Sequence, residues 1–181
     1  MVQAGEDIAR RLQNRDHQAW SELYEEYFPK VYRYVVLRVG NRTEAEDLAE
    51  QVFLKALESI SSFKWRGVPV PAWLFRIAHN QVVDYWRNTK SKGFLPLDED
   101  LVQDDADPQK EAEMSSDIQR VKGAMGQLTK AQRDVIELRF GGELSTAEVA
   151  KALGKSEGAV KVLQHNALVA LRKKLGGTEQ T

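Results

Sequence analysis

The stretch Ser145–Leu168, STAEVAKALGKSEGAVKVLQHNAL, predicts two short helices joined by a tight turn. Ser145 and Glu148 have the spacing of a capping box that starts the first helix, and Gly154 supplies the left-handed residue that ends it. Ser156 can cap the second helix. Apolar residues recur on one face of the two helices: Val149, Ala150, Leu153, Val160, Leu163, Ala167 and Leu168. The pattern indicates a helix-turn-helix that reads the DNA major groove, and a helical hairpin with no nucleic-acid role is the alternative that this stretch leaves open.

Composition restricts the class of protein. The chain has 181 residues, enough for one domain or two small ones, and no cysteine, which excludes disulfides, thiolate catalysis and cysteine-based zinc sites. Its three histidines lie far apart in sequence, so we expect no metal site and no cofactor. No apolar run has the roughly 18 residues of a membrane span, and the N-terminal sequence has no signal-peptide core. We therefore expect a cytoplasmic protein without membrane contact.

The net charge of −1 conceals a partition along the chain. Residues 1–90 carry 13 basic and 12 acidic side chains, residues 91–117 carry 2 and 9, and residues 118–181 carry 11 and 6. The acidic middle also contains Gly93, Pro96 and Pro108 and loses helical periodicity. The sequence thus predicts an all-α fold of two small helical domains, 1–90 and 117–181, joined by a flexible acidic linker over 91–116.

The N-terminal part predicts several amphipathic helices. A first helix is expected around Glu6–Asn14, and from Asp16 aromatic and aliphatic residues follow helical spacing as far as Gly40. Pro29 should kink this second helix or divide it in two. Thr43 and Glu46 have capping-box spacing and should open the next helix, AEDLAEQVFLKALESI. The aromatic residues of the second helix are expected in the core.

A basic segment follows, in which Lys64–Pro71 cannot be regular helix because it contains Gly67, Pro69 and Pro71. Trp65 stands between Lys64 and Arg66 in this loop. One side of the helix that follows carries polar residues: Arg76, Asn80, Asp84 and Arg87, beside Trp73. Such a segment suits single-stranded nucleic acid, whose bases stack on rings and whose phosphates meet cations. A core tryptophan with a solvated charged face explains the same residues equally well.

The ordered set of segments resembles the extracytoplasmic-function (ECF) group of bacterial sigma-70-type RNA polymerase sigma factors. AEDLAEQVFLKAL (45–57) is similar to region 2.2 of that family, and AWLFRIAHNQVVDYWR (72–87) is similar to regions 2.3 and 2.4. LTKAQRDVIELRF (128–140), which has a capping box at Thr129 and Gln132, resembles region 4 together with the helix-turn-helix. The resemblance covers roughly 16–175 and implies a factor that binds core polymerase and directs promoter recognition, melting and transcription initiation.

The resemblance assigns roles to residues of this sequence. The helix that docks on the β′ clamp of core polymerase holds Asp47, Leu48, Glu50, Gln51 and Phe53. Contact with the melted −10 element is implied for Lys64, Trp65, Arg66, Arg76, Asn80, Asp84 and Arg87. Contact with the −35 duplex is implied for Ser156, Glu157, Ala159, Lys161 and His165, with Lys155 as a further cation beside them. The implied partners are core polymerase (β′ clamp and β flap), duplex and single-stranded promoter DNA and an anti-sigma factor.

Two other classes of protein explain less of the sequence. A helix-turn-helix regulator with an N-terminal sensing or dimerisation domain leaves the tryptophan-bearing basic segment and the acidic linker unexplained. An enzyme acting on nucleic acid would need clustered carboxylates or histidines, whereas the acidic residues of this chain crowd into the linker. We therefore expect no catalytic residues.

Overall fold

The computed structural model describes residues 2–91 and 116–176, which are helical apart from turns and loops and contain no strand. The helices are α1 (Val2–Gln13), α2 (His17–Val39), α3 (Arg42–Ser59), the 3₁₀ turn η1 (Ile60–Ser62), α4 (Val70–Ser91), α6 (Ser116–Gly126), α7 (Lys130–Ile136), the π-helical η2 (Glu137–Gly141), α8 (Thr146–Leu153) and α9 (Glu157–Gly176). We call α1–α4 the N-terminal module and α6–α9 the C-terminal module. The all-α prediction with two helical units is confirmed, while the predicted linker lies almost wholly outside the described residues.

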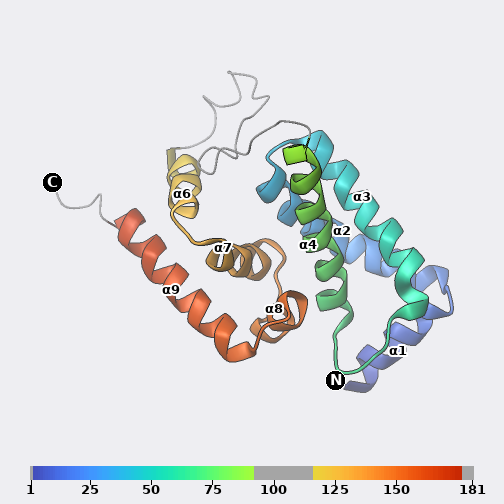
Figure 1. Ribbon diagram of the computed structural model, residues 1–181. Helices are drawn as coiled ribbons and strands as arrows, with labels where there is room; N and C mark the ends of the chain where they lie inside the picture. The colour runs from blue at the N-terminus through green and yellow to red at the C-terminus, as the bar shows by residue number, and fades with distance from the viewer. Residues whose placement is uncertain (1, 92–115, 177–181) are drawn as a thin grey trace.

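The N-terminal module is a bundle in which α2, α3 and α4 pack against one another and α1 crosses one end (Figure 1). Its core is built from the apolar faces that the spacing predicted, and Val35, Val52 and Leu74 are fully buried. On another side of α4 from Leu74, Phe75 and Val82 are fully buried as well. This helix therefore has neighbours on more than one side.

Helix α2 begins and ends where the sequence indicated. The Asp16 side chain accepts hydrogen bonds from the backbone amides of Gln18 and Ala19, and Gly40 ends the helix with a left-handed φ of 79°. Pro29 does not divide α2, which runs unbroken from His17 to Val39. A proline removes one backbone hydrogen bond, at a cost of about 3 kcal/mol, and burial of residues on both sides of Pro29 offsets that cost.

The predicted start of α3 is wrong by two residues. Asn41, rather than Thr43, is the N-cap, and its side chain accepts a hydrogen bond from the amide of Glu44 at 3.1 Å. Asparagine caps a helix at least as well as threonine does, and here it directly follows the left-handed Gly40. The competing signal therefore lay two residues upstream.

The C-terminal module follows its sequence signals closely. Both predicted capping boxes form, with Thr129 and Gln132 at the start of α7 and Ser145 and Glu148 at the start of α8. Gly154 ends α8 with a φ of 64°, and the Ser156 hydroxyl accepts the amide of Ala159 at 3.1 Å. The predicted helix-turn-helix is thus α8–turn–α9. In Figure 1, α9 lies along the side of the C-terminal module that faces away from α2 and α3.

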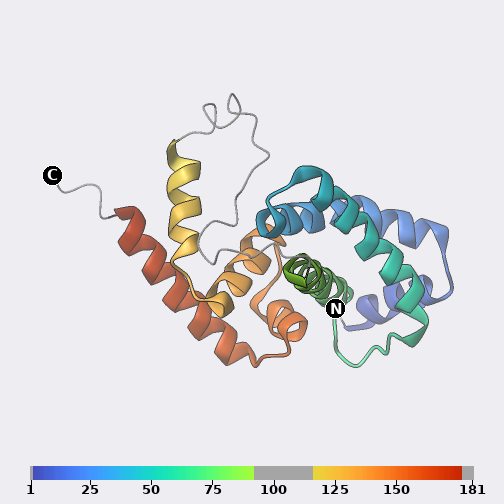
Figure 2. The same ribbon diagram turned by 45° about the horizontal axis from the view of Figure 1, so that its top comes forward.

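The two modules pack against each other, which the sequence did not indicate. Helix α8 lies against α4, and η2 lies against α2, as Figures 1 and 2 both show. Residues of both modules form one continuous buried cluster. The approach is close at Gly142, where a Cβ atom would come within 2.8 Å of the Phe75 ring. We call this packing the docked arrangement.

Candidate nucleic-acid interface

The outer face of α9 carries side chains that the fold leaves exposed. Each of the residues predicted to read duplex DNA is exposed: Lys155, Ser156, Glu157, Ala159, Lys161 and His165. On the opposite face, Val160 and Ala167 are buried. Lys161 forms an ion pair with Glu157 at 3.4 Å, one turn away on the same helix. A groove-reading role for this face remains a prediction, and its geometry is that of a helix presented for docking.

The loop between η1 and α4 carries the predicted base-binding residues. Lys64 and Arg66 are exposed, whereas the Trp65 ring is half-buried and packs against the core of the N-terminal module. Phe63, directly before the loop, is buried, and its ring centroid lies 5.0 Å from that of Trp73 in α4. The structure therefore combines the two explanations left open by the sequence, since Trp65 belongs partly to the core and partly to the surface.

The polar face of α4 is only partly open. Arg76, Asn80 and Arg87 are exposed and Asp84 is half-buried, with Arg87 paired to Asp84 at 3.4 Å. Arg76 donates a hydrogen bond to the backbone carbonyl of Lys151 in α8. On this face of α4, the Arg76 guanidinium is thus already engaged in the docked arrangement.

The residues predicted to meet polymerase divide into two groups on α3. Asp47, Glu50 and Gln51 are exposed, whereas Leu48 and Phe53 are only 8% exposed and belong to the core. Leu48 therefore fixes the position of the helix, whereas Phe53 also lines a groove between α2 and α3. The polar three are the members of the set that are placed for contact on the surface.

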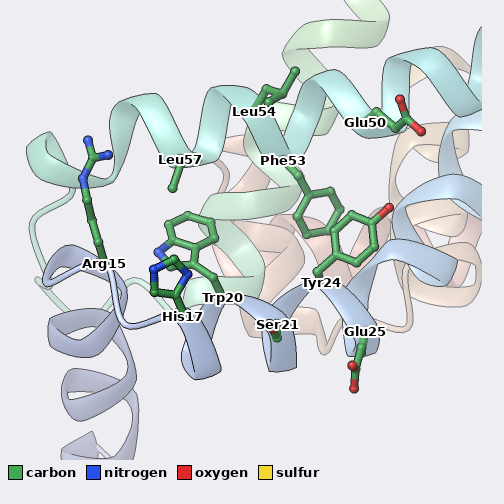
Figure 3. Close-up of a pocket in the computed structure, with 10 residues that line it drawn as sticks. All are labelled: Arg15, His17, Trp20, Ser21, Tyr24, Glu25, Glu50, Phe53, Leu54 and Leu57. Atoms are coloured by element: carbon green, nitrogen blue, oxygen red, sulfur yellow. The ribbon is translucent and has the colours of Figure 1, made fainter.

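Sequence reasoning missed an apolar groove beside these polar residues. A cavity of about 770 Å³ opens between α2 and α3, and in Figure 3 Trp20 and Tyr24 of α2 face Phe53 and Leu57 of α3 across it. Leu54, on its rim, is 60% exposed. The signal was present in the sequence, because Glu50, Leu54 and Leu57 share a helix face at spacings of four and three. An exposed apolar rim of this kind marks an interaction surface.

A buried cluster of three charges joins the modules. Arg38 of α2 forms ion pairs with Asp134 and with Glu137, the latter at 2.8 Å, and the Arg38 and Glu137 side chains are only 10% and 4% exposed. Burial opposes the charge of Arg38, but the attraction of Glu137 and the other acidic groups nearby prevails and raises the pKa of this guanidinium. Burial raises the pKa of Glu137 to about 7, although Arg38 pulls it down. One guanidinium thus faces two buried acidic side chains, and its attraction only partly offsets the effect of burial on the pKa of Glu137.

At the edge of the contact, Glu143 pairs with Lys30 and Arg33 of α2 at 3.6 and 3.1 Å. Glu143 has a positive φ of 58°, an unfavourable backbone conformation for a residue with a side chain. Nearby, burial lowers the pKa of His79, whose ring is within hydrogen-bonding distance of the Tyr34 hydroxyl at 3.1 Å. The Glu143 pairs add to the docked arrangement, whereas Tyr34 and His79 both belong to the N-terminal module.

Within residues 2–91 and 116–176, no group of three acidic or histidine side chains could hold a metal ion. No helix of the same ranges is long and apolar enough to cross a membrane.

Comparison with known proteins identifies the two modules. The family model described as Sigma-70 region 2 matches residues 23–92, and that described as Sigma-70, region 4 matches residues 124–173. The ECF RNA polymerase sigma factor BldN of Streptomyces coelicolor is 33% identical over 171 residues, which cover 93% of this chain and 65% of that relative. The ECF sigma factor SigX of Bacillus subtilis is 32% identical over 157 residues, 83% of this chain and 80% of that one.

A solved structure shares the fold. The sigma factor RpoE, in complex with the anti-sigma factor NepR from Bartonella quintana, superimposes with a TM-score of 0.64 at 21% identity, covering 88% of this chain and 98% of that one. The helix-turn-helix lies almost wholly within the segment that matches region 4, and the loop with Trp65 lies within the segment that matches region 2. The chain belongs to the ECF group of sigma-70-type RNA polymerase sigma factors.

Proposed function

We propose that the two modules divide promoter recognition between them, as the specificity subunit of a cytoplasmic RNA polymerase. The N-terminal module (1–90) docks on core polymerase and traps melted −10 DNA, and the C-terminal module (117–181) contacts the −35 duplex and the β flap. The observation that carries the proposal is the pairing of an exposed recognition helix, α9, with a cationic loop around Trp65. Catalysis belongs to the polymerase, and this chain supplies recognition.

On the N-terminal module, the polymerase surface is the outer face of α3. Asp47, Glu50 and Gln51 offer charged and polar contacts, and the groove with Leu54 and Leu57 offers apolar area beside them. An interface commonly combines an apolar centre with a polar rim, and this surface has both. The β′ clamp is the partner that family membership assigns to it.

The −10 contacts lie in the loop and along α4. Lys64 and Arg66 meet phosphates while the Trp65 ring stacks on an unpaired base. The module gains these contacts only when the base has left the duplex, so its binding favours melted DNA and offsets the few kcal/mol that unpairing costs.

The −35 contacts lie on α9. Lys155 and Lys161 approach phosphates or base edges, and the short side chains of Ser156 and Ala159 let the helix come close to the groove floor. Val160 and Ala167 hold the opposite face of α9 on its own module, so the exposed face is the one offered to DNA.

Promoter binding and the docked arrangement compete for the same residues. Arg76 cannot approach a phosphate while it is bonded to the carbonyl of Lys151, and α8 covers the neighbouring part of α4. We therefore propose that the modules separate when the chain engages polymerase and DNA. An anti-sigma factor is a further proposed partner, since the relative RpoE is seen with one.

The test is transcription in vitro with core polymerase on a randomised promoter library. The proposal expects initiation from promoters that share two short conserved elements, and no initiation from core polymerase alone. A helix-turn-helix regulator, the alternative, would instead bind duplex DNA by itself and would not convert core polymerase into an initiating enzyme. Absence of initiation together with tight duplex binding would favour that alternative.

A further inference from the structure

The N-terminal helix α1 contacts the loop that carries Trp65. A Cβ atom on Gly5 would lie 2.6 Å from the Trp65 indole, closer than real Cβ atoms approach a neighbour. Only glycine at position 5 therefore allows the ring to occupy this place. In Figures 1 and 2, α1 lies beside the loop that joins α3 to α4. Helix α1 also precedes the part of the chain that matches region 2, which begins at residue 23.

A second contact fixes the start of the same loop. The side-chain amide of Gln13, the last residue of α1, donates a hydrogen bond to the backbone carbonyl of Phe63 at 2.6 Å. Phe63 is buried and directly precedes Lys64. The loop is thus held by α1 at its first residue and again at its tryptophan.

Helix α1 is itself firmly seated in the module. Ala9 and Leu12 are buried in the core, and the indole nitrogen of Trp20 in α2 donates to the carbonyl of Leu12 at 3.0 Å. Arg11 pairs with Asp16 at 2.8 Å across the turn to α2. The surface on which Trp65 rests is therefore a fixed part of the fold.

From these contacts we infer that α1 is a positioning element for −10 base capture, in which Gly5 seats the Trp65 ring and Gln13 fixes the loop. The inference rests on the proposed function. A ring that is already held in place loses little conformational freedom when a base stacks on it, so seating the ring strengthens capture without any contact between α1 and DNA. Gly5 and Gln13 are positioning residues in this scheme.

The test compares Gly5→Ala with Gly123→Ala. The added methyl group displaces the Trp65 ring in the first variant, whereas in the second it meets no atom within 4 Å. The measurement is affinity of the reconstituted holoenzyme for a forked promoter with unpaired −10 bases, together with core-polymerase affinity and the thermal unfolding midpoint. We expect a threefold to tenfold loss of fork affinity for Gly5→Ala, unchanged core binding, and no loss for Gly123→Ala.

A double mutant separates positioning from a general structural role. In a Trp65→Ala background, Gly5→Ala should cause no further loss, because the ring it displaces is absent. An equal loss in both backgrounds, or no loss in either, would overturn the inference. Gln13→Met, which keeps length but removes the donor, should weaken fork binding in the same direction and serves where Gly5→Ala lowers the unfolding midpoint. Failure of the wild-type chain to open any promoter would count against the proposed function instead, so the two failures are distinguishable.

Discussion

The two DNA-binding surfaces of this sigma factor are supported in different ways. On α9 and the turn before it, the predicted contact residues are exposed, and Lys161 forms an ion pair with Glu157 of the same helix. On the N-terminal module, Trp65 rests against Gly5 and Arg76 bonds to a carbonyl of the other module. The proposed −35 surface is therefore exposed as it stands, whereas the proposed −10 surface rests on α1 and is partly engaged by α8.

This difference means that substitutions far from DNA should affect the two surfaces unequally. A change at the contact between modules alters access to α4 and leaves the face of α9 untouched. A change on α9 alters duplex binding and leaves access to α4 as it was. The following experiments test that separation.

The largest effect is expected for Arg38→Met. Removing the guanidinium leaves Asp134 and Glu137 buried without a counter-charge, a situation that costs roughly 3–5 kcal/mol. The docked arrangement should open, which fluorescence energy transfer between labels on the two modules would show as a longer distance. Arg33→Met removes a half-exposed pair with Glu143 and is the matched control, with an expected cost of about 0–1 kcal/mol. Equal distances in the two variants would contradict the prediction.

A pH dependence of docking follows from Glu137. Its pKa is raised from 4.5 to about 7 by burial, so the docked state binds a proton more readily than the separated state. Docking should therefore weaken as pH rises from about 4.5 to about 7, by up to about 3 kcal/mol. The same energy-transfer measurement across this range gives the slope.

Glu137→Gln should abolish this decrease in docking with rising pH. The comparison with wild type separates the contribution of Glu137 from that of His79. Burial lowers the pKa of His79, so its contribution has the opposite sign and strengthens docking as pH rises towards its ordinary value of 6.5. Arg38, Asp134, Arg133 and Tyr34 also face the Glu137 carboxylate or its neighbours and stay unchanged in the comparison. An identical pH profile for wild type and Glu137→Gln would remove Glu137 from the explanation.

Trp65→Ala tests the −10 surface directly. Base stacking on an aromatic ring contributes about 1–3 kcal/mol, so affinity for melted promoter DNA should fall by roughly five- to 150-fold. Binding to core polymerase should be spared, because Trp65 does not line the groove beside α3 that is proposed to meet polymerase. Fluorescence of 2-aminopurine in the −10 element reports opening. Trp65→Phe retains a ring and should restore much of it; normal opening by Trp65→Ala would reject the assigned role.

Lys161→Ala tests the −35 surface and should have the smallest effect. A base contact contributes roughly 1–3 kcal/mol, and the existing ion pair with Glu157 offsets part of it. Selection of −35 sequences by the variant holoenzyme should relax at one position if the contact is to a base edge. Uniformly weaker binding with a lower salt dependence would indicate a phosphate contact. Lys174→Ala, near the far end of α9, is the matched control.

The sequence predicted most of the local structure because its signals were local. The capping boxes at Thr129 and Ser145 and the glycine stops at Gly40 and Gly154 each act within one helical turn, and all of them form. The predicted start of α3 was wrong because Asn41, two residues before Thr43, is an equally good N-cap residue and is the one that caps the helix. Pro29 does not divide α2, since tertiary burial on both sides outweighs a local preference.

Contacts between distant segments were beyond the sequence. Nothing in the spacing of Arg38, Asp134 and Glu137 indicates that they meet, and nothing in the sequence indicates that Gly142 lies against Phe75. The burial of Phe75 has the same origin, because Gly142 of the other module lies against its ring. The roles of the DNA-contacting residues remain predictions.

The buried triad has a consequence for ionic strength. Dissolved salt screens exposed charges over about 8 Å at physiological concentration but acts much less on buried ones, so the pairs of Arg38 with Asp134 and Glu137 persist as salt increases. Affinity of cationic side chains for phosphates falls steeply under the same change. A rise in salt should therefore shift the chain from the promoter-bound state towards the docked arrangement, so that the balance between the two depends on ionic strength.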